Sequence, residues 1–330
     1  MDIQRRDFLK ASAAAAGGLL FSGKSSFGMA KPISKNNKIA GVIPKRPLGK
    51  TGEQLSLIGL GGIVVMNAEP EHAASVVAEC VERGINYFDV APTYGDAELK
   101  LGPALKPYRD KVFLACKTAN RDRAGAKEEL DASLKRLETD HFDLYQLHAI
   151  TDVEEDVKAA LGRDGVIQTF LEARKQGIIR YIGFSAHSTE AALTAMREFD
   201  FDTILYPINF CCHYRSGFDK EVLAEANKRN MGILAIKAMT KQRWQSEEAK
   251  KAYPKCWYEP IHEAEMARLA LSWTLSQKGV TAALPPGEEG PFRIAMDVAN
   301  SCGDISQASA EQLEKLSAEL DPLFPLREGD

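Results

Sequence analysis

One stretch of the sequence decides the fold: residues 112–148, which read VFLACKTANRDRAGAKEELDASLKRLETDHFDLYQLH. Its two ends, Val112–Thr118 and Phe142–His148, are apolar at successive positions, a pattern typical of strands covered on both faces. Between them, three leucines with helical spacing share one face: Leu130, Leu134 and Leu137. The stretch therefore predicts a strand, a helix and a second, parallel strand.

The same unit recurs along the chain. Eight apolar runs of strand length are each followed by a helical pattern: Leu55–Val65, Tyr87–Ala91, Val112–Thr118, Phe142–His148, Tyr181–Ser185, Thr203–Asn209, Gly232–Met239 and Thr281–Leu284. Eight such units predict an α/β fold of the (β/α)8, or TIM-barrel, type. A doubly wound sheet is the alternative, but it usually has fewer strands. We expect a single barrel domain over residues 43–325, with a hairpin at residues 43–54 that plugs its bottom.

The first thirty residues differ from the rest. Arg5 and Arg6 precede Phe-Leu-Lys and a short Ala/Gly-rich apolar run, and small residues surround Ala30. This pattern resembles a twin-arginine export signal and implies the export machinery as a partner and a periplasmic location. We expect a signal peptide over residues 1–30 and a flexible leader over residues 31–42. The run is too short to span a bilayer, so no stable membrane span is expected after cleavage.

Composition and charge narrow the function classes. The chain has 330 residues, of which 45% are apolar and 27% charged, as in globular proteins. Its formal net charge of −4 gives no reason to expect a nucleic-acid partner. No Cys-x-x-Cys pair occurs, so we expect no metal and treat the six cysteines as small buried apolar residues. Their pairing and the oligomeric state stay open.

Polar residues stand where the predicted strands end. In a barrel of this type, chemistry occurs at the carboxyl ends of the strands. Asp89, Lys117 and His148 lie at the ends of the second, third and fourth runs, and Tyr94 follows the second. Because these strands are neighbours around a barrel, we expect the four side chains to converge.

This constellation resembles that of the aldo-keto reductases. The resemblance extends from about residue 44 to about residue 300 and is carried by RPLGKTG (46–52), FDVAPTYG (88–95), SLKRL (133–137), DLYQLH (143–148) and RYIGFS (180–185). It implies a barrel with an NADP(H) or NAD(H) site at its mouth, a small carbonyl substrate and no metal.

Each of the four residues has a role in carbonyl reduction. The reduced oxygen needs a proton, and Tyr94 is the candidate general acid, with a reference pKa of ~10. The ammonium of Lys117 would favour the phenolate and make Tyr94 a better acid. Asp89 would keep Lys117 charged. His148 would orient the substrate oxygen or help to relay the proton.

Candidate cofactor contacts are less sharply marked. The resemblance implies that Ser185 contacts the nicotinamide carboxamide, and His187 stands near the position of a usual asparagine. The other candidates lie at strand ends or near a helix start: Gly61, Gly62, Asn209, Lys237 and Arg293. Arg293 would stack on adenine or pair with a phosphate, whereas Glu288 would repel a 2′-phosphate. NADP(H) and NAD(H) therefore both stay open.

The leading hypothesis is NAD(P)H-dependent reduction of an aldehyde or ketone. One alternative is a nucleotide-binding accessory or sensing barrel with little turnover. Another is a lyase that uses Lys117 or Lys237 as a Schiff-base amine. The physiological substrate is not readable. Aromatic residues of the segment 240–260 either line a substrate pocket or cover the barrel edge: Trp244, Tyr253, Trp257 and Tyr258.

Overall fold

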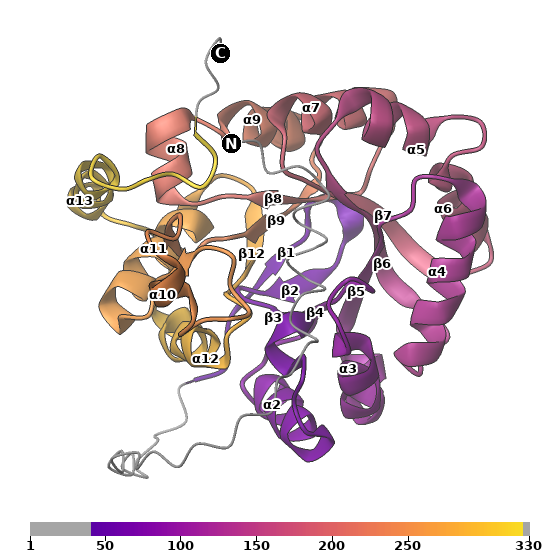
Figure 1. Cartoon of the computed structure of the whole chain (residues 1–330), viewed down its shortest axis with the longest axis horizontal. Coiled ribbons are helices and arrows are strands. Elements are labelled where there is room, and N and C mark those ends of the chain that lie inside the picture. The colour runs from indigo at the N-terminus through magenta and orange to yellow at the C-terminus, as the bar shows by residue number, and fades with distance from the viewer. Residues whose placement is uncertain (1–40, 326–330) are drawn as a thin grey trace.

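A computed structural model describes residues 41–325 of the chain (Figure 1). The expected signal peptide and the leader up to residue 40 lie outside the described residues.

Eight parallel strands form the wall of a barrel, in the order β12-β9-β8-β7-β6-β5-β4-β3. Their bounds are β3 Leu60–Gly61, β4 Tyr87–Asp89, β5 Phe113–Thr118, β6 Phe142–Ile150, β7 Ile179–Ala186, β8 Thr203–Pro207, β9 Gly232–Ile236 and β12 Val280–Leu284. The wall closes where Gly59 N–H donates to Ala283 O at 3.0 Å and Ala283 N–H donates to Leu57 O at 2.9 Å. The predicted (β/α)8 fold is confirmed.

Helices surround this wall (Figure 1). The longer ones are α2 Pro70–Glu82, α3 Ala97–Leu105, α4 Arg123–Arg136, α6 Val166–Lys175, α7 Thr189–Glu198, α9 Lys220–Lys228, α11 Ala264–Ser276, α12 Glu289–Val298 and α13 Gln307–Ser317. The shorter ones are α5 Ala159–Leu161, α8 Phe210–Ser216 and α10 Glu247–Lys250. Between residues 41 and 325, no helix combines the length and the apolar character needed to cross a membrane.

The first predicted run was wrong in extent. Leu55–Val65 contains the end of a hairpin strand, the barrel strand β3 and a 3-10 helix at Gly62–Val65. The hairpin pairs β1 Lys45–Pro47 with β2 Gln54–Ser56, so it ends two residues later than expected. Leu55 is apolar because it fills the barrel interior together with Leu48, not because it belongs to the wall. The hairpin does plug the bottom of the barrel, as predicted.

Two other predicted runs end early for local reasons. β8 stops at Pro207, and Asn209 then caps α8 by accepting a hydrogen bond from Cys212 N–H at 2.9 Å. β9 stops at Ile236, because Lys237 has a left-handed backbone with a φ of 65°.

Side-chain alternation along the strands explains how the site is positioned. On β5, Phe113 and Ala115 pack in the barrel interior, whereas Leu114 and Cys116 pack in the layer between sheet and helices. Both faces are covered, which is why the run is apolar at successive positions. The next interior position after Ala115 is Lys117, at the carboxyl end of the strand.

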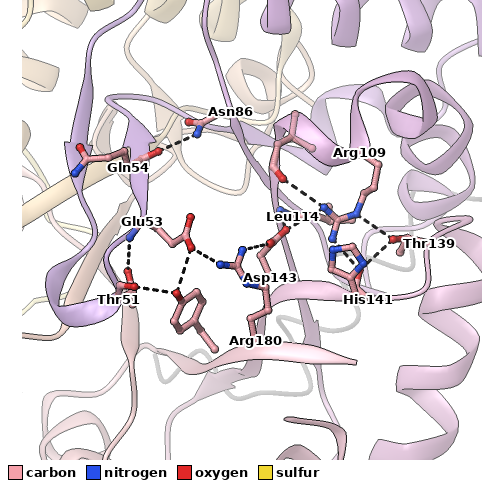
Figure 2. A network of polar contacts seen from close by, with 12 residues as sticks. Thr51, Glu53, Gln54, Asn86, Arg109, Leu114, Thr139, His141, Asp143 and Arg180 are labelled. Carbon is pink, nitrogen blue, oxygen red and sulfur yellow. Dashed lines mark hydrogen bonds and ion pairs between the residues drawn. The ribbon is translucent and has the colours of Figure 1, made fainter. Parts of the chain in front are cut away.

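A polar network ties the plug to the start of β6 (Figure 2). Arg109 donates to both Asp143 Oδ2, at 3.0 Å, and the carbonyl of His141, at 2.9 Å. We call Arg109 and Asp143 the base clamp. Arg180 donates to the other oxygen of Asp143 at 2.7 Å and pairs with Glu53 of the hairpin turn. Asp143 is buried and shared by two guanidinium groups, so it links three segments of the barrel base.

All six cysteines are free and buried, as expected of small apolar residues. Cys211 and Cys212 lie on α8. Within the described part of the chain, no group of three or more acidic, histidine or cysteine side chains is arranged to hold a metal ion.

Candidate active site

The structure brings Asp89, Lys117, Tyr94 and His148 together at the barrel mouth. Lys117 and Asp89 are fully buried and form an ion pair, and Lys117 Nζ also donates to the carbonyl of Val90 at 3.2 Å. Lys117 Nζ lies 5.3 Å from the centroid of the Tyr94 ring. The Tyr94 and His148 rings meet edge to face, with centroids 5.7 Å apart. One buried charge pair thus lies beneath two side chains, Tyr94 and His148, each of which can donate or accept a proton.

The charges around Tyr94 oppose one another. Burial raises the pKa of Tyr94, the Lys117 ammonium lowers it and Asp89 raises it, with a net increase. Burial lowers the pKa of Lys117, but Asp89 and Tyr94 raise it by a larger amount. The net pKa of Lys117 is therefore raised, and the lysine stays charged. The expected influence of Lys117 has the right sign, yet burial outweighs it. At neutral pH, Tyr94 therefore holds its proton, as a general acid must.

Asp89 has two further partners that satisfy its buried oxygens. Gln146 Nε2 donates to Asp89 Oδ2 at 3.2 Å, and the Tyr87 hydroxyl donates to the same atom at 3.3 Å. Sequence reasoning missed Gln146, although it lies two residues before His148 and so shares its face of β6. Its buried Oε1 has no hydrogen-bond partner among residues 41–325.

His148 is held from its side chain and from its backbone. Thr93 Oγ1 lies 3.4 Å from His148 Nδ1. The carbonyl of His148 accepts a hydrogen bond from Arg121 Nη2 at 2.7 Å, and Arg121 Nε binds Asp156 Oδ1 at 2.9 Å. We call Arg121 and Asp156 the mouth clamp. Sequence reasoning missed both residues: Arg121 lies in a loop, and Asp156 lies in a short π-helix, Val153–Lys158, that has no clear periodic signature.

Two predicted cofactor residues, Ser185 and Asn209, differ in the hydrogen bonds that they make within the protein. Ser185 Oγ accepts from Ala149 N–H at 2.7 Å and lies 3.5 Å from the carbonyl of Leu147. Asn209 is buried two residues after the end of β8, and its Nδ2 has no hydrogen-bond partner within the described chain. A carboxamide oxygen would satisfy that donor, so Asn209 fits a nicotinamide cofactor.

Lys237 and His187 form a second cluster at the mouth. Lys237 Nζ lies 2.9 Å from His187 Nε2 and 4.7 Å from the centroid of the Trp257 ring. Burial lowers the pKa of Lys237 to about 7. Burial and the charge of Lys237 also hold the pKa of His187 well below its usual value. The cluster is therefore only partly charged at neutral pH, and the charge resides on Lys237.

The aromatic residues of the segment 240–260 have two kinds of contact. Trp244 stacks on Tyr253, with ring centroids 6.1 Å apart, and its Nε1 donates to the carbonyl of Cys256 at 3.0 Å. These two rings fasten the segment to itself. Trp257 instead covers Lys237 at the mouth.

Arg293, Gly61 and Gly62 were also predicted to contact the cofactor, and each has different surroundings in the structure. Arg293, on α12, forms ion pairs with Glu79 and Glu289, so two carboxylates already neutralise it. A Cβ atom at Gly62 would lie 2.8 Å from Val90 Cγ2, whereas at Gly61 it would meet nothing within 4 Å. Gly62 is therefore required by the packing of the first strand, and Gly61 leaves open space at the mouth.

Comparisons with known proteins agree with the fold and identify the family. Residues 57–290 match the model of the Aldo/keto reductase family, and residues 2–22 match the twin-arginine translocation pathway signal sequence. The chain belongs to the aldo-keto reductase family.

Individual relatives are distant or partial. The chain is 36% identical over 156 residues to the uncharacterized oxidoreductase YqkF of Bacillus subtilis, covering 43% of this chain and 48% of the relative. It is 33% identical over 184 residues to the aldo-keto reductase YhdN of the same organism, covering 49% and 53%. The chain thus spans about half the length of these curated relatives.

Solved structures share the fold. An aldo-keto reductase from Bacillus halodurans, in its holo form, matches with a TM-score of 0.66 and 21% identity over 87% of this chain and 99% of that one. An aldo-keto reductase from Klebsiella pneumoniae in complex with NADPH matches with a TM-score of 0.65 and 20% identity over 88% and 98%.

Proposed function

We propose that the protein reduces an aldehyde or ketone to an alcohol with a nicotinamide cofactor, with Tyr94 as the general acid. The observation that carries the proposal is the buried Lys117–Asp89 pair beneath Tyr94 and beside His148. Removing two charges from water costs several kcal/mol per ion, and an apolar pair would fill the same space more cheaply. The retained charges are explained by a proton transfer at Tyr94.

The residues at the mouth divide the chemistry among them. The Tyr94 hydroxyl donates its proton to the carbonyl oxygen, and the Lys117 ammonium stabilises the phenolate that remains. Asp89 keeps Lys117 protonated. His148, whose ring faces Tyr94, orients the carbonyl oxygen toward the hydroxyl.

A bound dihydronicotinamide would supply the hydride that the carbonyl carbon accepts. Asn209 and Ser185 would hold its carboxamide, and Lys237 and His187 would lie beside it. The complex of the Klebsiella pneumoniae relative contains NADPH. In this chain Arg293 is already paired with Glu79 and Glu289, which weakens the case for a 2′-phosphate site. Both NADP(H) and NAD(H) stay candidates, and the local charge favours NAD(H).

We also propose that residues 1–30 are removed on export, that residues 31–42 form a leader and that the barrel over residues 43–325 acts in the periplasm. The signal match at residues 2–22 supports this. The twin-arginine route carries folded proteins, which suits an enzyme that acquires its cofactor before export.

One observation favours a second candidate, a Schiff-base lyase. Lys237 is buried and has a pKa of about 7, so half of it is an uncharged amine near neutral pH. Borohydride trapping with a carbonyl compound would reveal such an adduct. A sensing barrel with little turnover would bind the cofactor but would not oxidise it.

Titration of the purified protein with NADPH and NADH tests the proposal, with quenching of protein fluorescence as the readout. A panel of small aldehydes and ketones then tests for carbonyl-dependent oxidation of the bound cofactor. We expect saturable binding of at least one nucleotide and turnover with some member of the panel. Binding without turnover would favour the sensing barrel, and no binding would refute a nicotinamide enzyme.

A further inference from the structure

The mouth clamp gathers the loops that follow β5 and β6. The side chains of Arg121 and Asp156 are only 7% and 2% exposed. Asp156 Oδ2 accepts from the backbone N–H of Thr151 at 2.7 Å and from that of Asp152 at 3.1 Å. Burial raises the pKa of Asp156, but Arg121 and these two N–H groups lower it by a larger amount. The net pKa is therefore lowered, and the carboxylate stays charged.

The clamp acts on an irregular piece of backbone. β6 pairs in register with β7 up to Leu147 opposite Phe184, and the register then shifts until Ile150 lies opposite Ala186. Two residues of β6, His148 and Ala149, therefore occupy the space of one residue on β7, which is a β-bulge. Ala149 has a φ of 53°, a left-handed conformation that alanine rarely adopts.

Side chains hold this bulge where strand pairing is interrupted. Arg121 Nη2 donates to the carbonyl of His148 at 2.7 Å. Ser185 Oγ accepts from the N–H of Ala149 at 2.7 Å. Bulges near active sites redirect side chains, and the side chain at this one is His148. We propose that Arg121, fixed by Asp156, is a positioning residue: it clamps the bulge so that the His148 ring faces Tyr94.

The base clamp supplies a matched control at the opposite end of the same strand. Arg109 binds a buried carboxylate, Asp143, and the carbonyl of His141, the residue just before β6, just as Arg121 binds Asp156 and the carbonyl of His148. Seven residues separate the two carbonyls, which is about 23 Å along a strand. The two arginines have the same kind of contacts, but only one is near the site.

The test compares Arg121→Lys with Arg109→Lys. Lysine keeps the charge but loses the planar fork that binds a carboxylate and a carbonyl together. We expect Arg121→Lys to lower kcat about tenfold with an unchanged Kd for the cofactor, and Arg109→Lys to change kcat less than about twofold at a comparable loss in Tm. In a His148→Gln background, Arg121→Lys should cost less than about twofold, because its effect passes through His148.

A readout independent of turnover separates this inference, which rests on the proposed function, from that function. The chain has six histidines, so the imidazole NMR signals of His148 can be assigned by their loss in His148→Gln. We expect them to shift in Arg121→Lys and not in Arg109→Lys. Unchanged signals, equal kcat values for the two lysine variants, or an undiminished effect in the His148→Gln background would overturn the inference. Shifted signals in a protein without turnover would support the clamp and refute the proposed function.

Discussion

At the base of the barrel, Arg109 binds Asp143 of β6 and the carbonyl of His141 just before this strand. At the mouth, Arg121 binds Asp156 and the carbonyl of His148 near the end of the same strand. The base clamp joins a regular strand to the hairpin plug through Arg180 and Glu53 (Figure 2). The mouth clamp instead holds a bulge whose side chain faces the candidate acid. The two clamps make similar hydrogen bonds. Their roles therefore differ because one binds regular backbone at the base and the other binds a bulge at the site.

The largest contrast between the two ends concerns a tyrosine hydroxyl. Tyr94→Phe should reduce carbonyl reduction about a hundredfold or more while the cofactor still binds, because the proton donor is lost. At the base, the Tyr181 hydroxyl donates to the carbonyl of Thr51 at 2.9 Å. Tyr181→Phe should leave kcat within about twofold of wild type. Steady-state kinetics of both variants measure this, and full turnover in Tyr94→Phe would contradict the assignment of the acid.

The second contrast concerns stability. Asp143→Asn removes the charge that Arg109 and Arg180 share, and leaving a largely buried guanidinium without its counter-ion should cost about 2–3 kcal/mol of unfolding free energy. The kcat of the remaining folded protein should not change. Urea unfolding and kinetics on the same preparation check both halves. A lower kcat for Asp143→Asn without a loss of stability would mean that the base of the barrel affects the geometry of the candidate active site.

This contrast also marks how far the sequence could predict the site. Alternation along buried strands places Asp89, Lys117 and His148 inside the mouth, and these positions were found from the strand ends alone. The same rule would have found Gln146. Arg121 and Asp156 were not predictable, because a loop and a six-residue π-helix are too irregular or too short to show a period, and a bulge is a property of pairing between two strands.

The fold errors have a similar cause. Continuous apolar character in Leu55–Val65 reflects three different burial sites, namely the plug, the wall and a 3-10 turn, which hydrophobicity does not distinguish. The ion pairs of Arg293 were also beyond prediction from the sequence, because one partner, Glu79, is remote in sequence.

A third contrast concerns a charge that titrates. Burial lowers the pKa of Lys237 at the mouth to about 7. At the base, burial lowers the pKa of Arg180, but Asp143 and Glu53 raise it by a larger amount, so Arg180 stays charged. Lys237 is protonated below about pH 7 and loses its attraction for an anionic cofactor above it. The Kd for NAD(P)H should therefore rise about threefold from pH 6 to pH 8. Fluorescence titration measures it, and Lys237→Met should remove the pH dependence.

The smallest expected effect tests whether every ion pair near the mouth is functional. Arg293 Nε binds Glu289 at 2.9 Å, and its Nη1 pairs with Glu79, so α12 is tied to α2. Within residues 41–325, the hydrogen bonds of Arg293 go to residues of α2 and α12 and not to the backbone at a strand end. Arg293→Ala should therefore change the ratio of NADPH to NADH affinity less than about twofold and lower Tm slightly. A tenfold loss of affinity for NADPH but not for NADH would contradict this expectation. It would show that Arg293 breaks its ion pairs with Glu79 and Glu289 to bind a 2′-phosphate, so that an arginine already paired in the structure can still bind the ligand.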